Sequence, residues 1–232
     1  MGDIHGAWKA LVQCLERAGF DYQTDQLIQL GDVADGHADV YRCVEELLRI
    51  KNLIAIRGNH DEWFAEYINT GVHPDEWQQG GSGTAGSYLR LTGKDNGLNP
   101  ADIPATHQAF FRQQHLYYID EQNNCFVHAG FNRQQPFKGQ PSDIYTWDRQ
   151  LWQAALSCKG GRLGMKTSFT EIFIGHTSTT KWNVDQPMHA CNIWNMDTGA
   201  GHNGRLTIMD VATKQYWQSD KVTILYGPVM KG

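Results

Sequence analysis

The chain has 232 residues, of which 41% are hydrophobic and 19% are charged, as in ordinary globular proteins. Its formal net charge of −5 at pH 7 provides no basic field for a nucleic-acid backbone, so we expect no nucleic-acid partner. No apolar run approaches the roughly 20 residues that cross a bilayer, so we expect no membrane partner. We therefore expect one domain, residues 1–232, that acts on a compact substrate.

The five cysteines indicate a reducing compartment. Their number is odd, none form a C-x-x-C pair, and several fall within apolar segments, where cysteine behaves as a small hydrophobic residue. This pattern is typical of cytoplasmic proteins, so we expect a cytoplasmic location. The cysteines are Cys14, Cys43, Cys125, Cys158 and Cys191.

The first third of the chain alternates strand and helix patterns. Leu11 and Leu15 lie at helical spacing within residues 7–18, and Gly19 follows where a left-handed C-cap would end that helix. Short apolar runs then alternate with helical faces, which predicts β–α units around a parallel sheet. The runs are residues 27–30 and 53–56, and the helical faces cover residues 40–48 and 61–69.

The rest of the chain changes character twice. Residues 71–115 begin rich in Gly, Pro, Asn and Asp and continue into a helix beyond Pro104, so we expect an excursion from the main domain. Strands are expected at 125–127 and 171–174, followed by antiparallel strands without a clear helix in the last 45 residues. We predict an α/β fold in which two facing mixed β-sheets are flanked by helices, an αββα sandwich. The antiparallel strands are residues 193–196, 205–211 and 215–218.

Five short motifs place polar side chains at strand ends. In an open α/β sheet, ligands bind beyond the carboxyl ends of the strands, so side chains from separate motifs converge there. Glycines in the motifs let the backbone turn sharply and approach a ligand closely. Each motif except the first follows an apolar strand. The motifs are Gly2-Asp3-Ile4-His5-Gly6, Gly31-Asp32-Val33-Ala34-Asp35-Gly36, Gly58-Asn59-His60-Asp61, His128-Ala129-Gly130 and Gly175-His176-Thr177.

The donor atoms of these motifs favour a catalytic metal site. Asp3 and His5 are two positions apart, so they point the same way in an extended chain. The motifs offer carboxylates, imidazoles and an amide oxygen but no thiolate, a mixture that suits manganese, iron or zinc in a catalytic site. The candidate ligands are Asp3, His5, Asp32, Asn59, His128 and His176.

In this order the five motifs resemble the signature of the calcineurin-like metallophosphoesterases. The GDxHG and GNH forms resemble the bacterial serine/threonine phosphoprotein phosphatases of that superfamily, and the match covers residues 2–176. The resemblance implies two divalent metal ions, with manganese our first choice and iron or zinc open. It implies that Asp3 and His5 hold the first ion, Asp32 bridges, and the second ion is held by Asn59, His128 and His176.

The same resemblance implies hydrolysis of phosphate monoesters, with phosphoserine or phosphothreonine of a protein as the leading substrate and a small phosphoester as another. A hydroxide shared by both metal ions would attack phosphorus in line, without a phosphoenzyme. His60, oriented by Asp35, would be the general acid for the basic alkoxide that leaves. Arg149 lies in a Trp-Asp-Arg segment similar to one that binds phosphate in that family, and residues 77–88 resemble a glycine-rich stretch of the bacterial phosphatases.

Two departures from the family pattern affect these expectations. The second motif usually continues Asp-Arg-Gly, whereas this chain has Gly36 and His37 after Asp35, so Arg149, and after it Arg133 or His37, would grip the phosphate. The first motif usually follows an apolar strand, but here only Met1 precedes it. Either a first strand lies outside this sequence, or the first motif sits on an unusually free terminus.

Two other functions stay open. Related bacterial enzymes that hydrolyse dinucleoside polyphosphates share these motifs, and the missing arginine would also suit a non-catalytic phosphate-binding scaffold. Asp197-Thr198-Gly199 matches the aspartic-protease triplet, but no second copy exists to share a proton, so we expect a turn after a strand. Residues 160–167 resemble a phosphate-binding loop with the wrong spacing, and we expect a mobile loop. The oligomeric state is left open.

Overall fold

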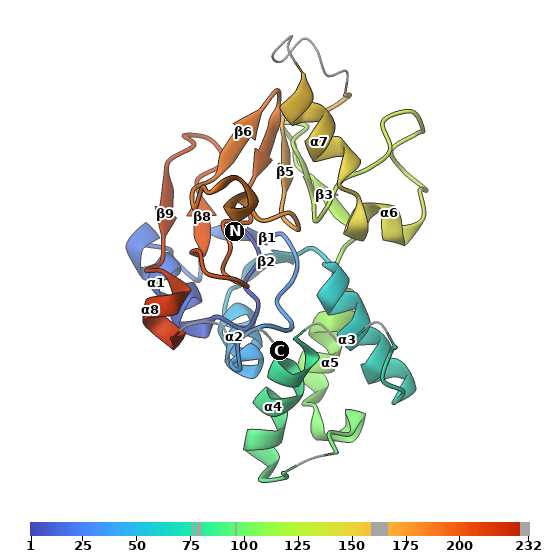
Figure 1. The fold of residues 1–232 in the computed structure, drawn as a ribbon, viewed down its shortest axis with the longest axis vertical. Coiled ribbons are helices and arrows are strands. Elements are labelled where there is room, and N and C mark those ends of the chain that lie inside the picture. The colour runs from blue at the N-terminus through green and yellow to red at the C-terminus, as the bar shows by residue number, and fades with distance from the viewer. Residues whose placement is uncertain (76, 78–79, 96, 159–166, 228–232) are drawn as a thin grey trace.

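The structure, a computed structural model, describes residues 1–75, 77, 80–95, 97–158 and 167–227. Its first third alternates helices and strands as predicted (Figure 1). β1 and β2 pair in parallel, and α1 ends at Gly19, whose φ of 63° gives the predicted left-handed cap. These elements are α1 (Trp8–Ala18), β1 (Gln26–Gln29), α2 (Val40–Leu48), β2 (Asn52–Ala55) and α3 (Asn59–Thr70).

Residues 71–115 form a helical group that packs against α2 and α3 (Figure 1). Its first helix contains most of the glycine-rich run from Gly80 to Gly86, where the composition did not indicate a helix. Glycine disfavours a helix by about 1 kcal/mol per residue, so packing must hold this segment in place. The group consists of α4 (Gly81–Thr92), the short 3-10 helix η1 (Pro100–Asp102) and α5 (Ala105–Gln113).

A five-stranded sheet follows, with strand order β3-β4-β5-β7-β6. Its three central strands are parallel and its two edge strands are antiparallel to their neighbours. Helix α7 packs against β6 and β7 (Figure 1). The strands are β3 (Tyr117–Ile119), β4 (Cys125–Val127), β5 (Ile172–Ile174), β6 (Met188–Ala190) and β7 (Ile193–Asn195), and the helices are α6 (Ser142–Trp147) and α7 (Gln150–Ser157).

The C-terminal part contains an antiparallel pair, β8 (Thr207–Met209) and β9 (Tyr216–Gln218), as predicted. The expectation that residues 193–196 join this antiparallel sheet was wrong, because β7 pairs in parallel with β5 in the five-stranded sheet. The expectation of no helix in the last 45 residues was wrong, because α8 (Val222–Tyr226) is helical. With five residues it is too short to show a helical period, and it is held by tertiary contacts, since the Tyr226 hydroxyl accepts a hydrogen bond from the Lys9 backbone N–H at 2.8 Å. The expected loop at 160–166 lies outside the described residues.

The backbone of Met1 and Gly2 connects two separate sheets. Met1 donates to the Ile28 carbonyl at 2.8 Å, and its own carbonyl accepts from the Leu30 N–H at 3.0 Å. Gly2 donates to the Thr207 carbonyl at 3.1 Å, in the first residue of β8. The first motif therefore does not sit on a free terminus, and that alternative was wrong.

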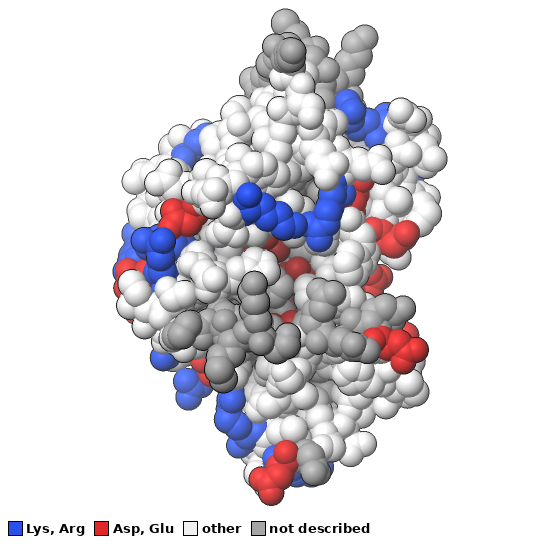
Figure 2. Space-filling view, in the orientation of Figure 1, with Lys and Arg blue, Asp and Glu red and all other residues white. Residues whose placement is uncertain are grey.

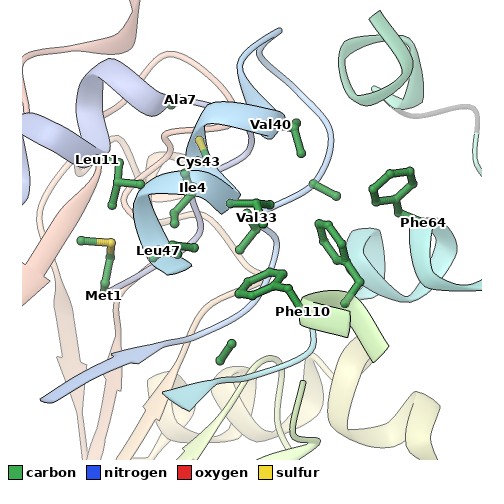
Figure 3. Close-up of a cluster of buried hydrophobic side chains, with 14 of the residues drawn as sticks. Met1, Ile4, Ala7, Leu11, Val33, Val40, Cys43, Leu47, Phe64 and Phe110 are labelled. Carbon is green, nitrogen blue, oxygen red and sulfur yellow. The ribbon is translucent and has the colours of Figure 1, made fainter. Parts of the chain in front are cut away.

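The predicted α/β class is confirmed, since helices surround several sheets and apolar side chains fill the space between them. The largest cluster joins α1, α2 and the start of the chain to α3 and α5 (Figure 3). A smaller cluster joins β4 and β5 to the segments after β1 and β2; it contains Leu30, Ile56, Phe126, Phe173, Met196 and Met209. None of the helices in the described part of the chain is long and apolar enough to span a membrane.

Candidate active site

Four of the five motifs lie at the carboxyl ends of parallel strands. Asp32 follows β1 and Asn59 opens α3 just beyond β2. His128 directly follows β4, and His176 follows β5. The parallel pairs β1–β2 and β4–β5 place their carboxyl ends at one edge. Side chains up to 117 positions apart therefore come into hydrogen-bond contact there. The predicted convergence of the motifs is thus seen in the fold.

Two groups of potential metal ligands share Asp32. The first contains His5, Asp32 and His60, and the second contains Asp32, His128 and His176; within each group the ligand atoms lie within 4.8 Å of one another. Oδ2 of Asp32 is 3.5 Å from Nε2 of His5 and 3.4 Å from Nε2 of His128. Asp32 thus faces both groups, the position that a bridging carboxylate needs.

Asn59 completes the second group. Its Oδ1 lies 3.2 Å from Nε2 of His128 and 2.9 Å from Nδ1 of His176. Nδ1 of His128 lies 2.7 Å from the Leu30 carbonyl, which can only accept a hydrogen bond, so Nδ1 carries the proton. In the neutral ring that metal binding requires, the Nε2 lone pair of His128 would face the site.

Asp3 lies beside these groups and not within either of them. Its Oδ2 accepts a hydrogen bond from the His176 N–H at 2.9 Å. Its Oδ1 and Nε2 of His176 are buried and have no hydrogen-bond partner among the described residues. Buried polar atoms are nearly always paired, so two unpaired ligand atoms of this kind fit a bound cation. Gly175 keeps the space open, because a Cβ there would lie 2.0 Å from Oδ1 of Asp3.

The charges of the site are consistent with cation binding. Burial raises the pKa of Asp3, and the neighbouring Asp197 and Asp32 raise it further. Burial alone would also raise the pKa of Asp32, but the surrounding histidines outweigh it and hold this pKa well below its usual value. Burial lowers the pKa of His5 to about 3. A neutral imidazole beside an ionised carboxylate is the protonation state that metal binding requires.

Comparison with known families identifies the fold. The model of the family named calcineurin-like phosphoesterase matches residues 1–186. The chain is a calcineurin-like phosphoesterase. Its membership confirms the resemblance inferred from the motifs, and the phosphoesterase is a hydrolytic enzyme.

The relatives of this phosphoesterase carry different names. It is 27% identical over 222 residues to serine/threonine-protein phosphatase 1 of Salmonella typhimurium, covering 90% of this chain and 88% of that protein. A solved structure provisionally named a diadenosine tetraphosphatase matches with a TM-score of 0.65 and 17% identity, over 94% of this chain and 90% of that one. A metallophosphoesterase of Sphaerobacter thermophilus matches with a TM-score of 0.57 and 17% identity, over 95% and 87% of the two chains. These two structural matches establish the fold alone.

His60 of the phosphoesterase is held between two carboxylates. Its ring Nδ1 lies 2.7 Å from Oδ2 of Asp35, and its backbone N–H donates to Oδ1 of Asp32 at 3.0 Å. Burial alone would lower the pKa of His60, but Asp32 and Asp35 outweigh it and raise the pKa. With Nδ1 engaged by Asp35, Nε2 is the ring atom left for the site.

Arg149 provides a cation beside the last motif of the phosphoesterase. Its Nη1 donates to Oγ1 of Thr177 at 2.9 Å, one residue from His176. Burial lowers the pKa of Lys181, and the charge of Arg149 lowers it further. Figure 2 shows basic side chains in a short band across this face, with acidic side chains beneath it.

The departure at Gly36 has a structural cause in the phosphoesterase. Gly36 has a φ of +75°, and a Cβ there would lie 2.9 Å from Cβ of His5, so an arginine does not fit. His37 is turned away, with Nε2 2.9 Å from the Ala200 carbonyl and its ring stacked on Tyr226. Arg149, by contrast, lies beside the last motif.

Sequence reasoning missed the part that Asp197 plays in the site. This buried residue lies in the turn after β7, and its backbone carbonyl accepts from the Thr179 N–H at 2.8 Å. Burial raises its pKa, and its carboxyl in turn raises that of Asp3. Asp197 belongs to the triplet Asp197-Thr198-Gly199, which we predicted to be a turn. Its distance along the sequence from the first motif gives no sign that the two lie close together. The parallel pairing of β7 with β5 brings Asp197 to the strand ends where the site lies.

Four side chains of the site sit on backbone in the left-handed region. The φ values are 48° at His5, 54° at Asp32, 69° at Asp35 and 64° at His176. Non-glycine residues occupy this region rarely, although Asp and His are more tolerant than most. Each such residue costs of order 1 kcal/mol, and these costs cluster at functional sites because the surrounding fold imposes them.

Proposed function

We propose that the phosphoesterase binds two divalent metal ions and hydrolyses phosphate monoesters, with manganese as the first choice of metal. The arrangement of two ligand groups around Asp32 is the observation that carries this proposal. Such ions would supply Lewis-acid chemistry, lowering the pKa of a water and neutralising phosphoryl oxygens. Asp3, His5 and Asp32 would hold the first ion, with Asp3 in place of the His60 that stands in the first group. Asp32, Asn59, His128 and His176 would hold the second.

Three residues would act on the substrate. Arg149 would hold the phosphate through its guanidinium, which offers a planar fork of donors. His60 would donate a proton from Nε2 to the leaving oxygen, while Asp35 keeps its Nδ1 protonated and its ring fixed. A serine or threonine alkoxide is strongly basic, so this proton matters most for such substrates.

We propose phosphoserine or phosphothreonine in cytoplasmic proteins as the substrate. The named relative from Salmonella typhimurium supports this choice, as does a His60–Asp35 pair suited to a poor leaving group. Hydrolysis of dinucleoside polyphosphates is the second candidate, motivated by the motifs that such enzymes share. Its leaving group is a phosphate, which needs little protonation, so the His60–Asp35 pair favours the first candidate.

The test compares substrates at a fixed manganese concentration. We expect phosphate release from a phosphoserine peptide to exceed turnover of diadenosine tetraphosphate, and chelation to abolish both. Faster turnover of diadenosine tetraphosphate would replace the first candidate by the second. If 4-nitrophenyl phosphate were also not hydrolysed in a metal-dependent way, the proposed activity as a whole would be wrong.

A further inference from the structure

The Asp35 carboxylate is enclosed by residues of the helical group 71–115. Asp35 is fully buried, and so are the two side chains that contact it from that group, Trp77 and Thr84. A buried carboxylate needs several hydrogen-bond donors to replace its lost hydration. His60 supplies one of them and approaches from α3, so the remaining donors decide which way the carboxylate turns.

Thr84 makes two contacts with Asp35. Its hydroxyl donates to Oδ1 at 2.7 Å and accepts from the Asp35 backbone N–H at 2.8 Å. Because one hydroxyl is tied to both the backbone and the carboxylate of the same residue, the Asp35 side chain is left with little rotational freedom. Oδ2 is thereby directed at Nδ1 of His60.

Trp77 closes the other side. Its indole N–H lies 2.9 Å from Oδ1 and 3.0 Å from Oδ2 of Asp35. The ring is fixed by packing against Phe64 and Tyr67, with ring centroids 5.6 and 5.5 Å away. The indole can therefore not follow the carboxylate if Asp35 turns, and it resists that motion.

The glycines of this segment make the close approach possible. A Cβ at Gly83 would lie 2.5 Å from the Gly36 carbonyl oxygen, and one at Gly81 would lie 2.8 Å from the indole nitrogen of Trp77. Gly80 has a φ of +85°, and its Cβ would lie 2.8 Å from the Gly36 backbone nitrogen. Only residues without a side chain bring the start of α4 against the Asp35–Gly36 turn.

We infer that Trp77 and Thr84 are positioning residues for the general acid, so that the helical group orients His60 through Asp35. This inference rests on the proposed role of His60. Neither residue touches the phosphate, so their loss should leave metal binding and attack at phosphorus intact. It should slow only the reactions that need a proton on the leaving oxygen, because a misdirected imidazole transfers its proton poorly.

The test uses substrates that differ in the basicity of the leaving group. For Thr84→Val and Trp77→Phe we expect kcat on phenyl phosphate and on a phosphoserine peptide to fall about tenfold, the usual scale for a lost hydrogen bond to a charged group. On 2,4-dinitrophenyl phosphate, whose leaving group needs no proton, kcat should change less than about twofold. Thr84→Ser keeps the hydroxyl and should restore kcat on phenyl phosphate.

Two control variants match these changes. Thr92→Val makes the same substitution in the last turn of α4, where the hydroxyl contacts only the Leu89 carbonyl among the described residues. Trp152→Phe removes an indole N–H that is buried without a hydrogen-bond partner in the described structure. Both should leave the ratio of the two aryl phosphate rates unchanged. Equal slowing of both aryl phosphates by Thr84→Val would overturn the inference.

Combination with His60→Asn adds a second test. If Thr84 acts through His60, Thr84→Val should cause no further slowing on phenyl phosphate in the His60→Asn background. A full tenfold effect in that background would contradict the inference. If phenyl phosphate is hydrolysed but the phosphoserine peptide is not, the protein-phosphatase proposal fails while this test still decides.

A spectroscopic measurement does not depend on turnover. The imidazole proton shared by His60 and Asp35 should give a low-field NMR resonance in the zinc-loaded protein, absent in Asp35→Asn. We expect Thr84→Val and Trp77→Phe to shift or broaden that resonance and Thr92→Val to leave it in place. An unchanged resonance in both Thr84→Val and Trp77→Phe would show that neither residue orients the Asp35 carboxylate.

Discussion

Oδ1 of Asn59 lies 2.9 Å from Nδ1 of His176, although the residues are 117 positions apart. Both side chains lie at the second ligand group, so they would hold the same ion. Asn59→Ala should lower the metal content of the purified protein from two ions to one per chain. Activity should fall by more than the roughly 10–100-fold typical of lost outer-shell partners. Metal analysis by mass spectrometry checks this, and two ions retained in the variant would contradict the ligand assignment.

His60 stands in the first ligand group, so its role as acid must be separated from a role as ligand. If His60 is the acid, His60→Asn should keep both metal ions and lose about 10²–10⁴-fold in kcat on a phosphoserine peptide, with a much smaller loss on 2,4-dinitrophenyl phosphate. If it is a ligand, the ion content should fall and kcat should drop equally on both substrates. Asp3→Asn provides the comparison, since it should release metal.

Gly83 and Gly86 lie in the same helix but differ in their surroundings. A Cβ at Gly83 would meet the Gly36 carbonyl oxygen at 2.5 Å, whereas nothing lies within 4 Å of a Cβ at Gly86. Gly86→Ala should stabilise the protein by about 0.5–1 kcal/mol through helix propensity. Gly83→Ala should destabilise it by about 1–3 kcal/mol through overpacking. Urea unfolding of both variants measures the difference, and equal effects would refute the close packing of α4.

Placing the family arginine at position 36 should not strengthen phosphate binding. The positive φ and the short approach to His5 leave no space for a side chain. Gly36→Arg should cost about 1–3 kcal/mol of stability and disturb metal binding at His5. Its KM for 4-nitrophenyl phosphate should rise, whereas a fall in KM would show that the turn can rearrange.

His107 should make stability depend on pH. Its buried ring contacts Glu45 at 2.6 Å and the Tyr88 hydroxyl at 3.0 Å, and Tyr41 packs beside it. Burial lowers the pKa of His107 in the fold, although Glu45 opposes this. The unfolded chain therefore takes up a proton first as the pH falls below about 6.5, and folding free energy is lost from there down to the lower folded pKa.

The variant His107→Asn lacks this linkage. Between pH 7 and pH 5 its unfolding free energy should fall less than that of the wild type, because the other titrating groups are common to both. Urea titrations at the two pH values provide the comparison. Parallel losses in both proteins would mean that His107 does not carry the effect.

Much of the fold could be predicted because local patterns and tertiary packing agree. The helical spacing in α1 and the cap at Gly19 specify the same boundary that the structure shows. The site could be predicted because its side chains follow apolar strands at their carboxyl ends. Parallel pairing then brings Asp32 and Asn59 to one edge without further information.

The parts that could not be predicted depend on contacts between distant segments. Helix α4 forms in a glycine-rich sequence because its start packs against the Asp35–Gly36 turn, which outweighs local propensity. Helices α6 and α7 also went unpredicted. Asp197 reaches the site through the order of strands in the sheet, which joins segments distant in sequence. Neither the composition nor the residue spacing of a local segment predicts these long-range contacts.

The left-handed backbone at His5, Asp32, Asp35 and His176 also limits how this protein can change. A residue in that conformation is placed by its neighbours, so the side chain alone cannot be transplanted into another loop. Glycine at any of the four positions would relax the main chain and remove the functional group together. The free protein should thus gain rigidity at these turns when cations bind, and directed evolution toward heat resistance should find few acceptable substitutions there.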